Sequence, residues 1–276
     1  MIIDHVLQSF PRLEIIPLKD LLVYEAFDPV RVEYLTKKIA HDNIFLQPII
    51  VGESPMGERI VLDGVNRREV LRRLDVHHVV AHVVSYFDQK EVELFSNRHY
   101  FFSNEKNLFT KIEKIFQQPL EKISLEQGES GILDQRLIGY VKVEDAIFSF
   151  GAHNLLNTTV DHMNAVVSSY LGQTEFCRQS EMDMGFSRVP LQIGFRRFTP
   201  QEIVDLSVQG KKVNSGITRH LVSVYCIGLH IPLSLLQSDL SSEEKNKELQ
   251  KILYNLVKNR AYRFYPRPIY KFDEKE

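Results

Sequence analysis

The sequence lacks the features that mark membrane, secreted and strongly basic proteins. No apolar run approaches the roughly 18–20 residues of a membrane span, and the start of the chain lacks the basic and apolar regions of a signal peptide. The two cysteines, Cys177 and Cys226, lie far apart without metal-ligand spacing, so we expect free thiols. The net charge of −2 provides no positive field for DNA or anionic lipid. We therefore expect a cytoplasmic protein with no membrane partner and no strong affinity for nucleic acid.

The length and composition are those of an ordinary globular protein. The chain has 276 residues, of which 43% are hydrophobic and 25% charged. This length suits one large domain or two modest ones. We expect an α/β (α+β) protein with two domains, a mixed-sheet domain over 1–120 and a second α+β domain over 121–276.

The first part of the sequence alternates between strand and helix patterns. Asp28 is a typical N-cap, and Pro29 at the first helical position predicts a helix to about His41. We expect a helical stretch from about Glu91 to Phe116. Apolar runs bounded by turn residues predict strands over 13–16, 48–51, 59–62 and 79–84.

The second part begins with turn signals at Pro119 and at 128–131, which we interpret as a boundary. Capping boxes at Thr199 and Ser241 each predict a helix, to about Gln209 and Arg260 respectively. Further patterns predict strands over 137–143, 146–150 and 218–229 and a helix over 160–171.

The most informative stretch is residues 60–74, where a short apolar run ends in Asp63-Gly64 and a helix follows directly. Glycine permits a sharp turn. The backbone N–H groups of Val65, Asn66 and Arg67 would then point out of the helix N-terminus, which favours an anion. Arg67 adds a cation suited to phosphate oxygens, and Asp63 adds a carboxylate for a magnesium ion. The alternative is a plain strand–helix turn, because short motifs also occur without function.

Two other segments could complete such a site. Glu25 lies just before the helix that Asp28 caps, where it is either a solvated loop residue or a general base brought near Asp63 by the fold. Residues 215–220, Ser-Gly-Ile-Thr-Arg-His, gather polar groups after a glycine and at a strand start. That segment has donors for a carboxylate and a hydroxyl, so it predicts a loop that contacts a small molecule.

Histidine and arginine clusters have simpler explanations. Alternation along a strand separates His77 from His78 and His82, and no carboxylate or cysteine completes a metal site. Arg68, Arg72 and Arg73 are best interpreted as the solvated face of an amphipathic helix rather than as a nucleic-acid grip.

The three segments together resemble the free L-serine kinases of the ParB/sulfiredoxin superfamily, a family with ADP-dependent archaeal and ATP-dependent siderophore-pathway members. The residues that carry the resemblance are those over 25–31, 63–67 and 215–220, and it extends over most of the chain, including 229–239. The sequence departs from the family at two positions. Asn66 stands where the family has histidine, and Asn97 stands where it has tryptophan, which this chain lacks entirely.

The resemblance implies an N-terminal ParB/sulfiredoxin-like domain, a second α+β domain and an active site in the cleft between them. It implies transfer of a phosphoryl group from ATP or ADP, with Mg²⁺, to free L-serine. Glu25 and Asp63 would be the catalytic acidic groups, with Asp63 also on the metal. The turn Gly64, Val65, Asn66 and Arg67 would hold the nucleotide phosphates, and Thr218, Arg219 and His220 would bind serine.

Two rivals remain within the superfamily. A ParB-like nucleotide-binding regulator without kinase activity would contact DNA, yet the sequence has no helix-turn-helix segment and its pI is about 6.6. A sulfiredoxin-type reductase needs a cysteine inside the turn, where Val65 and Asn66 stand instead. The choice of ATP or ADP, the pathway and the oligomeric state are not specified by the sequence.

Overall fold

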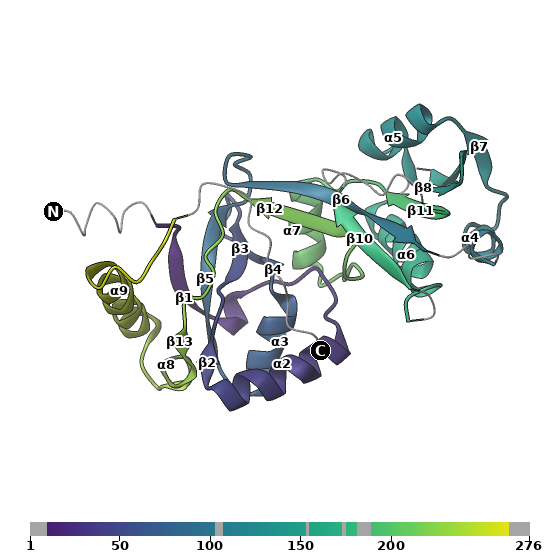
Figure 1. The fold of residues 1–276 in the computed structure, drawn as a ribbon. Helices are drawn as coiled ribbons and strands as arrows, with labels where there is room; N and C mark the ends of the chain where they lie inside the picture. The colour runs from purple at the N-terminus through teal and green to yellow at the C-terminus, as the bar shows by residue number, and fades with distance from the viewer. Residues whose placement is uncertain (1–9, 103–106, 153–154, 173–174, 181–188, 265–276) are drawn as a thin grey trace.

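The computed structural model describes residues 10–102, 107–152, 155–172, 175–180 and 189–264. Within these ranges the chain forms a mixed α/β structure with two main sheets that lie end to end (Figure 1). The predicted α/β class is therefore confirmed.

The first sheet has four strands in the order β1-β5-β3-β4. Strands β3 and β5 are parallel, and the other pairs are antiparallel. Helices α2 and α3 lie together beside one end of the sheet, and α9 lies along β1 (Figure 1). The bounds are β1 Leu13–Pro17, the 3-10 helix η1 Leu18–Asp20, α2 Pro29–Asp42, β3 Ile49–Glu53, β4 Arg59–Asp63, α3 Val65–Arg73, β5 His78–Ser85 and α9 Ser242–Lys258.

The second sheet has seven strands in the order β10-β6-β11-β8-β9-β7, with β12 paired to β6. The long strand β6 pairs with β12 along its first half and with β10 and β11 along its second half. The bounds are β6 Val92–Phe101, α4 Leu108–Phe116, β7 Glu121–Ile123, α5 Leu125–Leu133, β8 Leu137–Val143, β9 Ala146–Ala152, α6 Leu156–Ser168, β10 Phe176–Ser180, β11 Leu191–Phe195, α7 Pro200–Val208 and β12 Thr218–Val222.

Both faces of the first sheet are buried, which explains its nearly continuous apolar strands. Alternation along β3 sends Ile50 into the core that continues into the second sheet, and Ile49 and Val51 into the core formed with the helices. The residues of β4 alternate in the same way. Leu62 packs in the core that continues into the second sheet, and Val61 packs in the core formed with the helices. Two short strands, β2 (Ile44–Phe45) and β13 (Ile231–Pro232), and the helix α8 (Leu233–Gln237) complete the layer.

The end of the described chain returns to the first sheet. The side-chain amide of Asn246 on α9 accepts a hydrogen bond from Ile15 N (2.8 Å) and donates one to Ile15 O (2.9 Å). Helix α9 thus occupies the free edge of β1. The proposed division of the chain at residue 120 stays a prediction.

Most elements predicted from the sequence are confirmed, and three predictions are wrong. Residues 92–101 of the expected helical stretch form β6, because the packed strands on both of its sides outweigh local helix preference. The expected boundary at 128–131 lies inside α5, where Gly128 and Gly131 allow close packing against Tyr140 and Leu137. The strand expected over 218–229 ends at Val222.

Candidate active site

The turn between β4 and α3 has the geometry expected of an anion-binding helix N-terminus. Gly64 caps α3 with a left-handed backbone (φ 96°), and a Cβ there would lie 2.6 Å from Ile49 Cγ2. The first bond of the helix runs from Arg68 N to Gly64 O (2.9 Å). The backbone N–H groups of Val65, Asn66 and Arg67 precede that bond, so they point out of the helix end. The Asp63 side chain is 54% exposed beside them.

Arg67 orders this turn through contacts with the protein itself. Its Nη1 donates to the carbonyls of Gln47 (2.9 Å) and Pro48 (2.6 Å), and its Nη2 pairs with Asp63 Oδ2 (2.7 Å). The guanidinium therefore fixes the carboxylate on one oxygen and connects α3 to the residues before β3. Its predicted contact with a phosphate stays a prediction.

Asn66 joins the turn to the segment that carries Glu25. Its Oδ1 accepts a hydrogen bond from the backbone N–H of Asp28 (2.8 Å), and Asp28 in turn caps α2 through Val30 N (2.9 Å). Asn66 is thus a structural link between two of the three predicted motifs.

Glu25 lies between the turn and the loop before β12. The backbone around it pairs with Val213, through Val213 N to Tyr24 O (2.7 Å) and Ala26 N to Val213 O (2.9 Å). Glu25 Oε1 accepts a hydrogen bond from Gly216 N (3.0 Å). Burial, reinforced by the nearby charge of Asp63, raises the pKa of Glu25 to about 7 in spite of that bond. A carboxyl group with this pKa can exchange a proton near neutral pH.

The loop before β12 is held by polar side chains on β6. His99 Nε2 lies 2.9 Å from Gly216 O, and Asn97 Nδ2 donates to the same carbonyl (3.1 Å) and to Thr218 O (3.2 Å). The other ring nitrogen of His99 contacts Tyr170 Oη at 2.6 Å. Burial lowers the pKa of His99 to about 3, so the ring is neutral and its bonds fix its orientation.

Strand β12 divides the three predicted serine-binding residues between two faces. Thr218 and His220 are buried on one face, and Arg219 is exposed on the other, because side chains alternate along a strand. Tyr24 Oη lies 2.7 Å from Thr218 Oγ1 and 3.4 Å from His220 Nδ1, and Tyr86 Oη lies 2.8 Å from His220 Nε2. Burial lowers the pKa of His220 to about 3. The structure therefore brings Thr218 and His220 together and does not bring Arg219 to them.

Sequence reasoning missed the residues that hold this site in place. Tyr24, Tyr86 and His99 each fill a buried hydrogen-bonding position, but no motif or spacing marks them in the sequence. Of the three, Tyr24 is adjacent in the sequence to a predicted site residue, Glu25.

Magnesium fits the chemistry of the turn as an ion bound jointly with phosphate. Among the residues that the structure describes, no three His, Cys, Asp or Glu side chains gather into a metal cage. Mg²⁺ is commonly held by one or two carboxylates together with substrate phosphates. Asp63 is exposed beside the helix N-terminus, where it could supply such a ligand.

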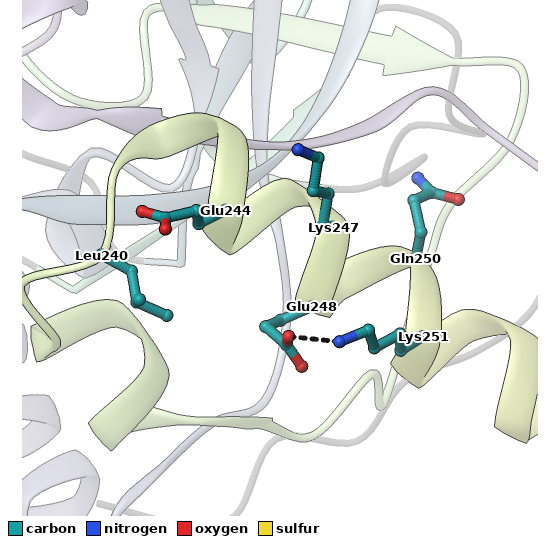
Figure 2. A pocket seen from close by; sticks show the side chains of 6 residues that line it. All are labelled: Leu240, Glu244, Lys247, Glu248, Gln250 and Lys251. Atoms are coloured by element: carbon teal, nitrogen blue, oxygen red, sulfur yellow. Dashed lines mark hydrogen bonds and ion pairs between the residues drawn. The ribbon is translucent and has the colours of Figure 1, made fainter.

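A separate surface hollow lies on the outer side of α9 and is not part of this site. Figure 2 shows that an ion pair between Lys251 and Glu248 (2.6 Å) crosses it. Its lining comes from α9 and from a residue two positions before the helix: Leu240, Glu244, Lys247, Glu248, Gln250 and Lys251. Within the described ranges, no helix is both long and apolar enough to span a bilayer.

The chain is similar over nearly its whole length to known serine kinases. It is 24% identical over 261 residues to the ATP-dependent L-serine kinase SbnI of Staphylococcus aureus. The aligned region covers 91% of this chain and 94% of that protein. A solved structure of SbnI with a C-terminal truncation, from the same organism, matches with a TM-score of 0.73 at 20% identity. That match covers 89% of this chain and 97% of the other. No protein-family model matches the chain.

A second group of solved structures extends the likeness to nucleotide complexes. A free serine kinase in complex with AMP matches with a TM-score of 0.67 at 16% identity, over 83% of this chain and 95% of that chain. A variant of a free serine kinase in complex with ADP gives 0.67 at 15% identity, over 81% and 93% of the two chains. This chain has the fold of the free serine kinases.

Proposed function

We propose that this protein is a nucleotide-dependent kinase that transfers a phosphoryl group to the hydroxyl of free L-serine and forms O-phospho-L-serine. The near full-length similarity to an ATP-dependent L-serine kinase supports the activity. The shared fold with a free serine kinase that binds AMP and ADP supports the use of an adenine nucleotide. ATP and ADP both remain candidate donors.

One observation carries the proposal. The Asn66–Asp28 hydrogen bond holds the helix N-terminus at 63–67 next to the segment of Glu25, and the charge of Asp63 affects the pKa of Glu25. An anion-binding helix end thus adjoins a carboxyl group that can accept a proton at neutral pH. This pairing suits phosphoryl transfer to a hydroxyl, because the reaction depends on positioning, charge neutralisation and removal of one proton.

In this proposal Glu25 is the general base. Ionised Glu25 takes the proton of the serine hydroxyl as the serine oxygen forms a bond to the terminal phosphorus and the bond from that phosphorus to the nucleotide oxygen breaks. The Gly216 N–H bond to Oε1 orients the carboxylate toward the position assigned to the hydroxyl. The proton ends on Glu25 and is released to water after the product leaves.

The phosphates of the donor are assigned to the backbone of Gly64, Val65, Asn66 and Arg67. Helix N–H groups stabilise phosphate charge without needing to move. Magnesium, when bound, would neutralise further charge on the transferring group. Asp63 would hold it, with Arg67 keeping the carboxylate in place.

Thr218, Arg219 and His220 remain assigned to the serine side of the site. The bonds of Thr218 and His220 to Tyr24 and Tyr86 support a role in shaping the wall next to Glu25. Closure of a cleft between two domains, and a cytoplasmic location, stay part of the proposal.

Phosphorus NMR tests the function directly. The pure protein is incubated with Mg²⁺, ATP or ADP and a panel of hydroxyl-bearing amino acids. We expect O-phosphoserine with at least one donor. Absence of any phosphorylated amino acid with both donors would overturn the kinase assignment.

A further inference from the structure

Arg178 is a charged residue near Glu25 that no sequence motif marks. It lies on β10, opposite His99 of β6, and its side chain is exposed. The side chain runs across the Cα face of Gly216: a Cβ on that glycine would lie 2.4 Å from both Cδ and Nε of Arg178 and 2.6 Å from Cζ. Position 216 therefore has to be glycine for the guanidinium to lie there, in addition to its left-handed backbone (φ 86°).

The surroundings of Arg178 hold the guanidinium without neutralising it. Cζ lies 5.2 Å from the centroid of the Phe176 ring, a cation–π distance. In the described ranges no carboxylate forms an ion pair with it. Its positive charge lowers the pKa of Glu25, an effect smaller than that of burial.

Gly216 connects the two groups directly. Its N–H donates to Glu25, its Cα face supports Arg178, and its carbonyl is held by His99 and Asn97. Gly216 therefore lies between the carboxylate of Glu25 and the guanidinium of Arg178 and brings both to one small region. Two such groups close together suit a small ligand that is bound by two of its own groups.

The position of Arg178 relative to the turn at 63–67 indicates which anionic group it would bind. The donor phosphates are assigned to the end of α3 on the first sheet, whereas Arg178 belongs to β10 of the second sheet, on the side of Glu25 reached through Gly216. In a 2-amino-3-hydroxy acid the hydroxyl and the carboxylate are separated by two carbon atoms. A hydroxyl on Glu25 therefore places its carboxylate within a few ångströms of the base.

We propose that Arg178 binds the carboxylate of the amino-acid acceptor and so selects amino acids over other small alcohols. This inference rests on the proposed kinase function. It assigns the carboxylate to a residue on β10 rather than to Arg219, whose side chain lies on the opposite face of β12 from Thr218 and His220. A planar guanidinium suits a carboxylate because it can donate two parallel hydrogen bonds.

The test compares L-serine with L-serinamide, which keeps the hydroxyl and amino groups but has no carboxylate charge. For Arg178→Ala we expect the KM for L-serine to rise about 10- to 100-fold, the range for losing a charge-assisted hydrogen bond. The KM for the nucleotide and the kinetics with L-serinamide should stay unchanged. Arg178→Lys should recover part of the preference. Where turnover of L-serinamide is too slow, calorimetric binding of both compounds replaces it.

Two further variants are matched controls. Arg136→Ala removes an exposed arginine that pairs with Asp134, so it reports the effect of losing one positive charge elsewhere. Arg219→Ala tests a residue that the family resemblance, together with Thr218 and His220, assigns to serine binding. Circular dichroism and thermal melting check that each variant is folded.

Several results would overturn the inference. Equal losses with L-serine and L-serinamide would make Arg178 structural only, and a raised nucleotide KM would make it a phosphate ligand. Loss of the serine preference in Arg219→Ala but not in Arg178→Ala would return the task to Arg219. If the wild type phosphorylates no amino acid, the proposed function fails and the inference fails with it. An active wild type with unchanged selectivity in Arg178→Ala overturns the inference alone.

Discussion

The two loops that flank Glu25 are built in different ways. The turn at 63–67 is shaped partly by its own residues, since Gly64 turns the chain and Arg67 pairs with Asp63 four residues earlier. Arg67 also donates to the carbonyls of Gln47 and Pro48. The loop at 214–217 is held by residues far away in the sequence, with Asn97 and His99 both bonded to the carbonyl of Gly216.

The difference explains what each loop can do. The glycine and the ion pair within the turn set the direction of its backbone N–H groups, which suits a phosphate site. The loop at 214–217 takes its position from side chains on β6, and its Gly216 N–H binds Glu25. The position of the second sheet therefore affects the position of the Glu25 carboxylate. Glu25 is the residue where the two contributions meet.

The largest effect is expected from replacing the carboxylate of Glu25. Glu25→Gln should lower kcat at least about a hundredfold, as for the loss of a general base. Nucleotide binding should stay nearly normal, because the amide keeps the size of the side chain and can still accept from Gly216 N. Rapid-quench turnover and calorimetric nucleotide binding measure the two quantities.

Asp63→Asn is the counterpart on the turn. It should lower kcat to a similar extent but also weaken Mg²⁺-dependent nucleotide binding, because Asp63 is assigned to the metal. Near-normal turnover in a folded Glu25→Gln protein would contradict the assignment of the base and transfer that role to Asp63.

The next effect is on pH dependence. The folded pKa of Glu25 is about 7, and the base acts when ionised, so kcat should fall about tenfold per pH unit below 7 and level off above it. Asp63 contributes to that raised pKa, so Asp63→Asn should move the break in the residual activity to lower pH. A break that stays in place would show that the titrating group is another residue.

Breaking the local turn should have an intermediate effect. Gly64→Ala places a Cβ against Ile49 and strains the left-handed backbone, so we expect about a tenfold loss of nucleotide affinity and a destabilisation of about 1–3 kcal/mol. Gly57→Ala is the matched control, since Gly57 also has a positive φ (89°) but no atom lies within 4 Å of its Cβ position. Equal effects at both glycines on nucleotide binding would contradict the crowding argument.

The smallest effect is expected from removing the Asn97 side chain, which bonds the loop before β12 from β6. Asn97→Ala removes the donor to the Gly216 and Thr218 carbonyls, so the KM for serine should rise about three- to tenfold, while nucleotide affinity stays unchanged. Steady-state kinetics with each substrate varied in turn measure this. A change confined to the nucleotide would show that the loop belongs to the phosphate side.

The same contrast decides how much could be predicted from sequence. The first sheet, the cap at Asp28 and the turn at Gly64 follow from local patterns, and the structure has them where those patterns indicate. The sequence predicts helix where β6 forms, because polar residues of that strand, such as Asn97, find their hydrogen-bonding partners only through the fold. The position of Arg178 depends on the pairing of β10 with β6, which no local pattern encodes.

The helix α9 has a consequence for the order in which the protein can be made. Its Asn246 covers both backbone groups of Ile15 on the free edge of β1, yet the ribosome completes the whole second sheet before it reaches α9. During translation the edge of β1 therefore keeps unpaired backbone groups until α9 is made. Unpaired strand edges are sites at which incompletely synthesised chains aggregate. A nascent chain stalled before α9 would be a substrate for chaperones.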